Sequence, residues 1–272
     1  MFTKYLSHTY QKDIAPIVSP PRRVPIALRH KLKSELSRMT HLDVIEPVND
    51  PSEWVNPLVL VEKPNGQLRI CLDPQELNKA IKRHHFKLPT PEELFSEMSG
   101  AKYFTKLDAS SGYWQIKVDH ESSKLLTFAT PFGRYRFKRL PFGILSASEI
   151  FQSSLAEIIS GIEGVRNSQD DIIIWGENID ILNARTHAVL QKIKNSGMKL
   201  NKNKCLFAQL SLTFLGHKLS GEGVSPDHTK VKAIQEMPNP ECWKDLERFL
   251  GMVAYLAKFI PNLSEKTHEL RL

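Results

Sequence analysis

"RNSQDDIIIWG", residues Arg166 to Gly176, places two adjacent carboxylates, Asp170 and Asp171, directly before a run of apolar residues. The apolar run predicts a buried strand that follows a turn. Two like charges at the mouth of such a strand are unfavourable, because they repel each other and lose solvation. Taken alone, the pair favours a hairpin turn, where Asp is common. A divalent cation, which takes oxygen ligands, is the alternative.

The composition limits the class of protein. With 272 residues and 41 % apolar content, the chain is long enough for a substantial core. The net charge of +7 suits a polyanionic partner such as nucleic acid, or equally a solvated basic surface. Its three cysteines lie far apart, without the spacing of a zinc site. No stretch has the apolar length of a signal peptide or membrane span, so we expect a soluble intracellular protein, cytoplasmic or nuclear, with no membrane partner.

Periodicity and turn residues predict strands and helices that do not alternate as regular βαβ units. We expect helices over 27–39, 91–98, 146–160, 184–195, 229–237 and 242–259, with capping boxes that begin at Thr90 and Ser146. We expect strands over 58–63, 67–73, 102–108, 113–118 and 212–220, on both sides of 131–133, and on both sides of Asp170. Residues before 24 suit an extended lead-in. No glycine-rich phosphate loop is present. The pattern favours an antiparallel sheet with helices on one face and an attached strand-rich lobe.

Asp108 ends the strand predicted over 102–108. If that strand neighbours the strands around Asp170 and Asp171, the three carboxylates converge at one sheet edge. Such a cluster can hold two Mg²⁺ ions, one that lowers the pKa of an attacking hydroxyl and one that steadies a pyrophosphate leaving group. For Asp108 alone, a strand-ending cap is the simpler explanation.

Six stretches follow one another in the order of a known family: "NPLVLVEKPNGQLRICLDPQELNKAI", "YFTKLDASSGYWQIKV", "LPFGILSASEIFQ", "QDDIIIWG", "GMKLNKNKC" and "FLGHKLS". On these motifs the chain resembles the reverse transcriptase of gypsy-type long-terminal-repeat retrotransposons, a part of their Pol polyprotein. The resemblance runs from about Val24 to Leu263. It implies an α+β right-hand polymerase fold, with fingers and palm built on antiparallel sheets and the start of a helical thumb.

The resemblance also implies a division of the chain. Residues 1–23 would be the lead-in, 24–86 and 116–146 the fingers, 87–115 and 147–222 the palm, and 223–272 the truncated start of a thumb or connection. The chain stops at "EKTHELRL" without a capping signal, so we expect a polyprotein fragment. Ribonuclease H activity of the parent polyprotein is a second alternative, but no second carboxylate cluster follows Leu263.

The implied activity is that of an RNA-directed DNA polymerase, a nucleotidyltransferase. It would bind an RNA or DNA template with a primer and add deoxynucleotides to the primer 3′-hydroxyl, with two Mg²⁺ ions or with Mn²⁺. Asp108, Asp170 and Asp171 would be catalytic and hold the metal. Lys204 aligns with a lysine proposed to protonate pyrophosphate, although "KLNKNK" is also an ordinary basic run. The oligomeric state is not predicted.

The nucleotide-binding residues that the resemblance implies are Lys63, Arg69, Gly112, Tyr113, Phe142 and Gly143. Lys63 and Arg69 flank the first hairpin and would reach a triphosphate, although basic hairpin tips also serve solubility. Tyr113 would clash with a ribose 2′-hydroxyl and so favour deoxynucleotides; a packed aromatic residue is the alternative. Phe142 and Gly143 would lie beside the base and backbone, where glycine permits close approach.

Primer binding would fall to Phe214, Leu215 and Gly216 in "FLGHKLS", unless this is an ordinary core hairpin. In the last predicted helix, an apolar stripe is expected to be mostly core. Its members are Trp243, Leu246, Phe249, Leu250, Val253 and Tyr255.

Two positions depart from the family pattern. Ser168 stands where the metal-binding turn usually carries a tyrosine, and Ser148 stands where a proline is usual. Both bear on the placement of primer and template, and a misplacement of about 1 Å can cost on the order of a hundredfold in rate. Two hypotheses stay open: an active but impaired polymerase, and an inactive or co-opted remnant that still binds nucleic acid.

Overall fold

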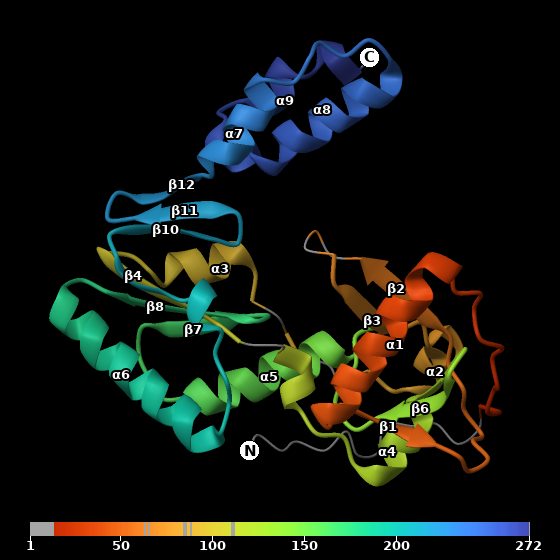
Figure 1. The fold of residues 1–272 in the computed structure, drawn as a ribbon. Coiled ribbons are helices and arrows are strands. Elements are labelled where there is room, and N and C mark those ends of the chain that lie inside the picture. Colours follow the sequence, from red (N-terminus) through yellow and green to blue (C-terminus); the bar gives the residue numbers. More distant parts are fainter. Residues whose placement is uncertain are drawn as a thin grey trace. The chain divides into compact units, whose positions relative to one another are not determined.

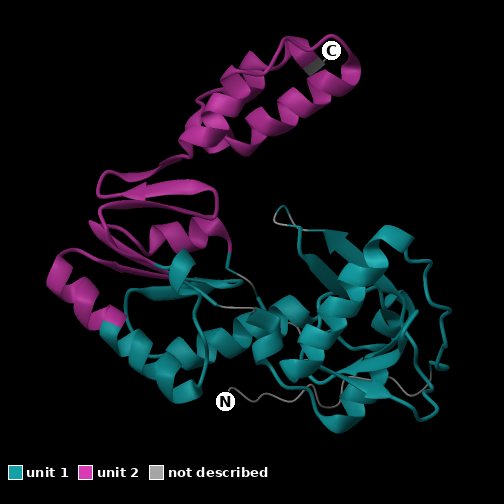
Figure 2. Cartoon of the chain, viewed as in Figure 1, with its two compact units in different colours: residues 1–89, 107–172, 187–205 teal, residues 90–106, 173–186, 206–272 magenta. Residues whose placement is uncertain are grey.

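The computed structural model describes residues 14–62, 64, 66–83, 86–87, 89–109 and 112–271. The chain divides into two compact units (Figure 2). Unit 1 contains residues 1–89, 107–172 and 187–205, and unit 2 contains residues 90–106, 173–186 and 206–272. The elements along the chain (Figure 1) include sheets in the orders β1-β6-β5, β2-β3, β7-β8-β4-β9 and β10-β11-β12. The predicted mixture of helices and antiparallel strands is confirmed.

Unit 1 begins with an extended segment and a helix. Val18 forms a parallel bridge with Val55, so residues 14–25 lie along the surface as predicted, while residues 1–13 fall outside the described chain. Of the apolar face that periodicity predicts, helix α1 (Ile26–His41) buries Leu32, Leu36 and Met39, whereas Leu28 is half-buried.

Two predicted hairpins are present in unit 1. Its first elements are β1 (Ile45–Val48), β2 (Leu58–Glu62), β3 (Leu68–Leu72), α2 (Gln75–Ala80), α4 (His120–Leu125), β5 (Thr127–Thr130) and β6 (Gly133–Phe137). Strand β2 pairs antiparallel with β3, and β5 pairs with β6 through Thr130 and Gly133. At the tip of the first hairpin, Lys63 lies outside the described residues.

The elements around the carboxylates are β4 (Tyr103–Asp108), η1 (Gly112–Gln115), α5 (Ala147–Ile159), β7 (Val165–Ser168), β8 (Asp171–Gly176), α6 (Ile179–Ser196) and η2 (Lys202–Lys204). Asp108 ends β4 as predicted. The strand predicted over 113–118 is wrong, because residues 112–115 form a 3₁₀ turn. This turn is fixed by the Gln115 side chain, which donates to the Lys199 carbonyl at 2.9 Å and accepts from the Lys199 N–H at 2.7 Å.

One of the two predicted capping boxes is formed. Thr90 and Glu93 cap α3 (Pro91–Ser96) reciprocally. Ser146 makes no side-chain cap on α5, and its backbone is not extended as a cap requires (φ −93°, ψ 6°). The Glu149 carboxylate accepts from Arg83 Nε at 2.9 Å instead of turning back to Ser146.

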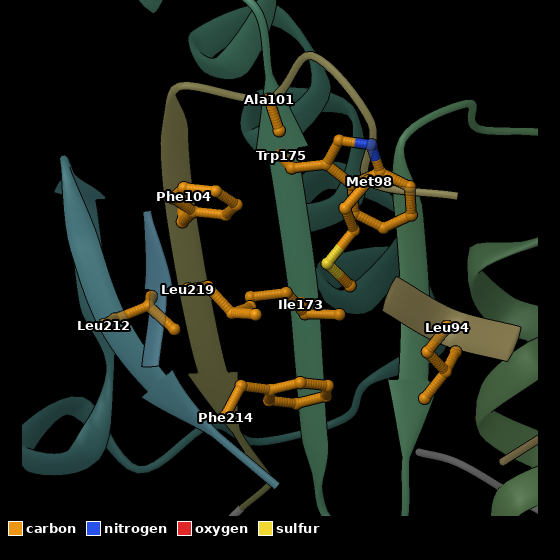
Figure 3. Close-up of a cluster of buried hydrophobic side chains, with 9 residues drawn as sticks. All are labelled: Leu94, Met98, Ala101, Phe104, Ile173, Trp175, Leu212, Phe214 and Leu219. Carbon is orange, nitrogen blue, oxygen red and sulfur yellow. The ribbon is translucent and has the colours of Figure 1, made fainter. Parts of the chain in front are cut away.

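Unit 2 has its own apolar core. Its elements include α3, β9 (Leu206–Gln209), β10 (Ser211–Phe214), β11 (His217–Ser220), β12 (Gly223–Pro226), α7 (His228–Gln235), α8 (Trp243–Tyr255), η3 (Ala257–Phe259), α9 (Leu263–Lys266) and η4 (Glu269–Arg271). The stretch 212–220 is a tight hairpin of β10 and β11. Figure 3 shows the core, which consists of Leu94, Met98, Ala101, Phe104, Ile173, Trp175, Leu212, Phe214 and Leu219.

The apolar stripe of α8 is not mostly core. Only Val253 in this helix is buried, while Trp243 and Tyr255 are 63 % and 47 % exposed. The prediction was wrong because periodicity indicates an apolar face without saying how much of that face meets another element. Within the described chain, we find no helix with the length and apolar character needed to cross a membrane.

Candidate active site

The turn between β7 and β8 meets the end of β4. Gln169 adopts a left-handed backbone (φ 50°), which turns the chain so that Asp170 lies in the turn and Asp171 begins β8. The Asp170 carbonyl accepts a hydrogen bond from the Ala109 N–H at 2.8 Å, directly after Asp108. The structure therefore brings the end of β4, with Asp108, beside the Asp170–Asp171 turn, but among the described residues the three carboxylates do not form the single metal-holding group that the sequence predicts.

A buried glutamine of α5 fixes this turn. Gln152 is 2 % exposed, and its Oε1 accepts from the Gln169 N–H at 2.6 Å. Its Nε2 donates to the Asn167 carbonyl at 2.7 Å, and Asn167 Nδ2 donates back to the Gln152 carbonyl at 3.1 Å. The sequence-based prediction gave Gln152 no role. The available signal was an uncharged polar residue on the core-facing side of a helix, between Phe151 and Leu155.

Like charges crowd Asp170. Burial, first, and then the neighbouring Asp108 and Asp171 raise the pKa of its carboxyl above the ordinary value, and the cations Lys204 and Arg69 oppose this. The ionised form of the Asp170 carboxyl is therefore disfavoured, because the nearby cations do not fully offset the burial and the like charges.

Lys204 is the cation paired with this edge. Its Nζ lies 3.3 Å from Asp108 Oδ2, with 66 % of the lysine side chain exposed against 13 % of the aspartate side chain. The backbone around η2 sets this position, since the Asn201 N–H donates to the Asp108 carbonyl at 2.9 Å and the Lys204 N–H donates to the Asn201 carbonyl at 3.0 Å. The sequence-based prediction placed Lys204 in the site, and the structure brings it to Asp108.

The carboxylates suit a magnesium ion that also takes ligands from substrate and water better than a metal ion bound by protein ligands alone. Across the residues described, no three His, Cys, Asp or Glu side chains are grouped closely enough to hold a metal ion. Mg²⁺ is usually bound by one or two carboxylates together with substrate phosphates and water. The uncompensated Asp170 beside Asp108 fits that donor set, and a three-carboxylate cluster that includes Asp171 is not formed.

Gly112 and Tyr113 lie against the carboxylates. A Cβ atom on Gly112 would come within 2.5 Å of Asp170 Oδ1, so a larger residue there would force the Asp170 carboxylate to move. The Tyr113 ring packs 4.9 Å from the Phe142 ring and 5.7 Å from the Phe151 ring, between centroids. Burial and the nearby Asp170 raise the pKa of the Tyr113 hydroxyl, which keeps it neutral. Phe151 was not predicted as part of the site.

Phe142, Gly143 and Arg69 adjoin Tyr113, with the Phe142 ring in contact with both Tyr113 and Arg69. Gly143 has φ 107°, and a Cβ atom there would lie 2.1 Å from the Leu72 carbonyl oxygen, so glycine is required twice over. The Arg69 guanidinium lies over the Phe142 ring, 5.0 Å from its centroid. Five of the six predicted nucleotide-binding residues are thus brought together, and the sixth, Lys63, lies outside the described residues.

The predicted primer-binding residues belong to unit 2. The Phe214 side chain is fully buried in the core of Figure 3, so only its backbone is available to a primer. Leu215 and Gly216 form a left-handed turn (φ 50° and 74°). The Leu215 carbonyl lies 2.9 Å from His217 Nδ1 and accepts from the Tyr255 hydroxyl at 3.3 Å.

His217 is enclosed by aromatic rings. Phe95, Tyr255 and Phe259 lie with ring centroids 5.2, 5.9 and 5.8 Å from the imidazole. Burial lowers the pKa of His217, and the cation Lys258 lowers it further. A neutral imidazole therefore donates from Nδ1 to the Leu215 carbonyl, and the turn is part of a packed cluster.

Comparison with known proteins identifies the family. Residues 61–219, more than half of the chain, match the family model described as reverse transcriptase (RNA-dependent DNA polymerase). The chain is 32 % identical over 262 residues to the Retrovirus-related Pol polyprotein from transposon 412 of Drosophila melanogaster, covering 93 % of this chain and 21 % of that polyprotein. It is 34 % identical over 216 residues to the Transposon Tf2-3 polyprotein of Schizosaccharomyces pombe, covering 79 % of this chain and 16 % of that one. The chain thus spans about a fifth of the length of these relatives.

Solved structures share the fold. The foamy viral protease-reverse transcriptase in complex with dsDNA superposes with a TM-score of 0.86 at 21 % identity, over 98 % of this chain and 56 % of that one. The same viral protein in complex with an RNA/DNA hybrid gives a TM-score of 0.85 at 21 % identity, over 97 % and 36 % of the two chains. This confirms the predicted right-hand polymerase fold. The family match spans both Asp108 and the Asp170–Asp171 turn, and the chain belongs to the reverse transcriptase (RNA-dependent DNA polymerase) family.

Proposed function

We propose that this chain is the RNA-directed DNA polymerase module of a gypsy-type retrotransposon Pol polyprotein. It would transfer deoxynucleotides to a primer 3′-hydroxyl. One observation carries the proposal: Asp170 lies near the like charge of Asp108, and the cations Lys204 and Arg69 do not offset the resulting rise in the pKa of the Asp170 carboxyl. The order of the six motifs supports the gypsy-type origin. The 32 % identity to the transposon 412 polyprotein, against 21 % to the foamy viral chain, supports a retrotransposon origin.

Asp108 and Asp170 would hold Mg²⁺, or Mn²⁺, with Asp171 supporting them from the start of β8. When bound, the metal supplies Lewis-acid chemistry, which makes a hydroxyl more acidic and stabilises a phosphate leaving group. Lys204, already beside Asp108, would deliver a proton to the departing pyrophosphate.

The residues beside the carboxylates would bind the nucleotide. Arg69 would bind the triphosphate bidentately, and Phe142 with Gly143 would border the base. The half-buried Tyr113 ring, held between Phe142 and Phe151, would leave no room for a ribose 2′-hydroxyl. This arrangement favours deoxynucleoside triphosphates.

The nucleic-acid partner would be an RNA or DNA template with its primer. The net charge of +7 supports this, as does the fold shared with a reverse transcriptase solved with dsDNA and with an RNA/DNA hybrid. Contacts to phosphates would make binding independent of sequence and sensitive to salt. The fingers, palm and thumb ranges given above, and the primer contact at Leu215 and Gly216, are part of this proposal.

Primer extension tests the proposal. The purified chain is incubated with a primed RNA or DNA template, Mg²⁺ or Mn²⁺, and either deoxynucleotides or ribonucleotides. We expect extension that depends on the metal and on deoxynucleotides. Ser168, in place of the usual tyrosine, favours the second candidate function, a remnant that binds nucleic acid without turnover. Duplex binding without extension under any of these conditions would establish the remnant and refute the polymerase.

A further inference from the structure

One side chain closes the loop that carries the predicted nucleotide-binding residue Phe142. Asn78, on α2, donates from Nδ2 to the Gly143 carbonyl at 3.0 Å. The same amide accepts, at Oδ1, a hydrogen bond from the Leu145 N–H at 2.9 Å. Asn78 therefore ties both ends of the segment 143–145 to α2. The sequence-based prediction gave this residue no role.

The chemistry of the contact requires a carboxamide. An Asn side chain offers a donor and an acceptor at once, whereas an ionised Asp only accepts and Ala does neither. An ionised Asp at this position would also face the Gly143 carbonyl with like partial charge. The segment forms no helix or strand and has a left-handed residue, Gly143; besides the bond from the Ala147 N–H to the Ile144 carbonyl at 3.1 Å, the two Asn78 bonds hold its ends.

The clamped loop determines where Phe142 lies. The Phe142 carbonyl accepts from the Leu72 N–H at 3.0 Å, which fixes the backbone of this residue. Its ring contacts the Tyr113 ring and the Arg69 guanidinium. If the loop loosens, the Phe142 ring no longer holds Tyr113 in one place. A change at Asn78 therefore reaches the sugar side of the proposed nucleotide site without touching it.

We infer that Asn78 is a positioning residue for nucleotide selection, acting through the 143–145 segment on Phe142 and Tyr113. This inference rests on the proposed polymerase function. It assigns Asn78 to the affinity for the incoming nucleotide and to the discrimination between deoxyribose and ribose. It does not assign Asn78 to primer–template binding or to the chemical step.

The kinetic test compares Asn78→Ala and Asn78→Asp with the wild type in single-nucleotide extension. We expect KM for the deoxynucleotide to rise roughly tenfold, about 1.4 kcal/mol of lost binding. The preference for deoxynucleotide over ribonucleotide, as a ratio of kcat/KM, should fall, while Kd for primer–template stays the same. The matched control is Lys79→Ala on the same helix, whose side chain pairs with Glu76 and should leave all three values unchanged. An unchanged KM and unchanged sugar preference in both Asn78 variants would overturn the inference.

A second measurement does not need turnover. Hydrogen exchange of the Leu145 amide reports the bond to Asn78 directly, and we expect faster exchange in Asn78→Ala at an unchanged Tm. Equal exchange in the two proteins would overturn the clamp whether or not the protein extends primers. If the wild type extends no primer, the proposed function fails. Faster exchange in the variant would then still support the clamp, while its assignment to nucleotide selection would fall with the function.

Discussion

Two tight turns of this chain share an unfavourable left-handed backbone conformation but are held by different side chains. Gln169, in the β7–β8 turn, and Leu215, in the β10–β11 turn, both have φ 50°, a conformation that residues other than glycine rarely adopt. The first turn is held by the buried amide of Gln152 and presents crowded carboxylates. The second is held by His217 and Tyr255 among aromatic rings.

The charges around the two turns also differ: the cations near the second turn have partners, whereas the carboxylates at the first turn repel each other. Near the second turn, Lys230 Nζ lies 3.7 Å from the centroid of the Tyr255 ring, and Lys258 pairs with Glu92 at 3.3 Å. Near the first, burial and repulsion at Asp170 outweigh the cations. Packing alone gives a turn no reason to keep such repulsion, whereas sites that bind a charged ligand often retain an unfavourable arrangement in its absence. This difference in charge supports the proposed metal-binding role of the β7–β8 turn, and the proposed primer contact at the β10–β11 turn rests on other evidence.

The largest expected effect is on stability at the second turn. Phe214→Ala removes a fully buried ring from the core of unit 2 and should lower the free energy of unfolding by about 3–5 kcal/mol. Urea unfolding measures this. Thr213→Ala, an exposed neighbour on the same strand, should change stability by about 0.5 kcal/mol or less. Equal effects of the two changes would contradict the core assignment.

At the first turn, the expected effect is on activity. Gln152→Ala removes the bonds that orient residues 167–169, and a shift of about 1 Å in the carboxylates should slow primer extension on the order of a hundredfold. The control is Ser153→Ala, where the lost hydroxyl bonds only to its own helix. Extension at the wild-type rate in Gln152→Ala would mean that the turn keeps its shape without this support.

The carboxylate repulsion predicts an unusual gain in stability. Because the folded-state pKa of Asp170 is raised, its ionisation destabilises the fold at neutral pH, and Asp170→Asn should raise Tm of the metal-free protein by roughly 1–2 °C. The gain should shrink as the pH falls and vanish below the ordinary aspartate pKa of about 3.9, where both states are protonated. Thermal melts between pH 3 and 7 measure it, with a chelator present. A loss of stability at pH 7 would contradict the account of this site.

The smallest expected effect concerns the departure from the family pattern. Ser168→Tyr restores the usual aromatic residue at the end of β7. It should raise the rate of primer extension several-fold, which is less than the roughly hundredfold rate loss that a misplacement of about 1 Å causes. Steady-state extension on a primed RNA template measures it. If the rate does not change, the missing ring is not what limits this copy.

Sequence patterns predicted the elements whose local signals are strong. Turn residues marked the hairpins, as at 131–133, and the apolar run after Asp171 marked β8. The 3₁₀ turn at 112–115 was missed because Gln115 bonds to Lys199, 84 positions away, and no local signal reports that bond. The Ser146 capping box failed for a similar reason, since Glu149 is engaged by the distant Arg83.

For the site, the family motifs named the charged and aromatic residues but not the amides that hold them. Asp108, Asp170, Lys204, Tyr113 and Phe142 were predicted and lie together. Gln152 and Asn78 were missed, because an uncharged amide shows its role only when its partners, here backbone groups of other segments, are known.

RNA-templated incorporation of a single deoxynucleotide tests the central claim most directly. Wild type, Asp108→Asn and the exposed control Asp50→Asn are compared with Mg²⁺, and binding of the primed template is measured in parallel. We predict that wild type and Asp50→Asn incorporate the nucleotide, and that Asp108→Asn is slower by about a thousandfold, a barrier increase of roughly 4 kcal/mol, with template binding intact. Incorporation by Asp108→Asn at the wild-type rate would contradict the assignment of this carboxylate edge as the active site.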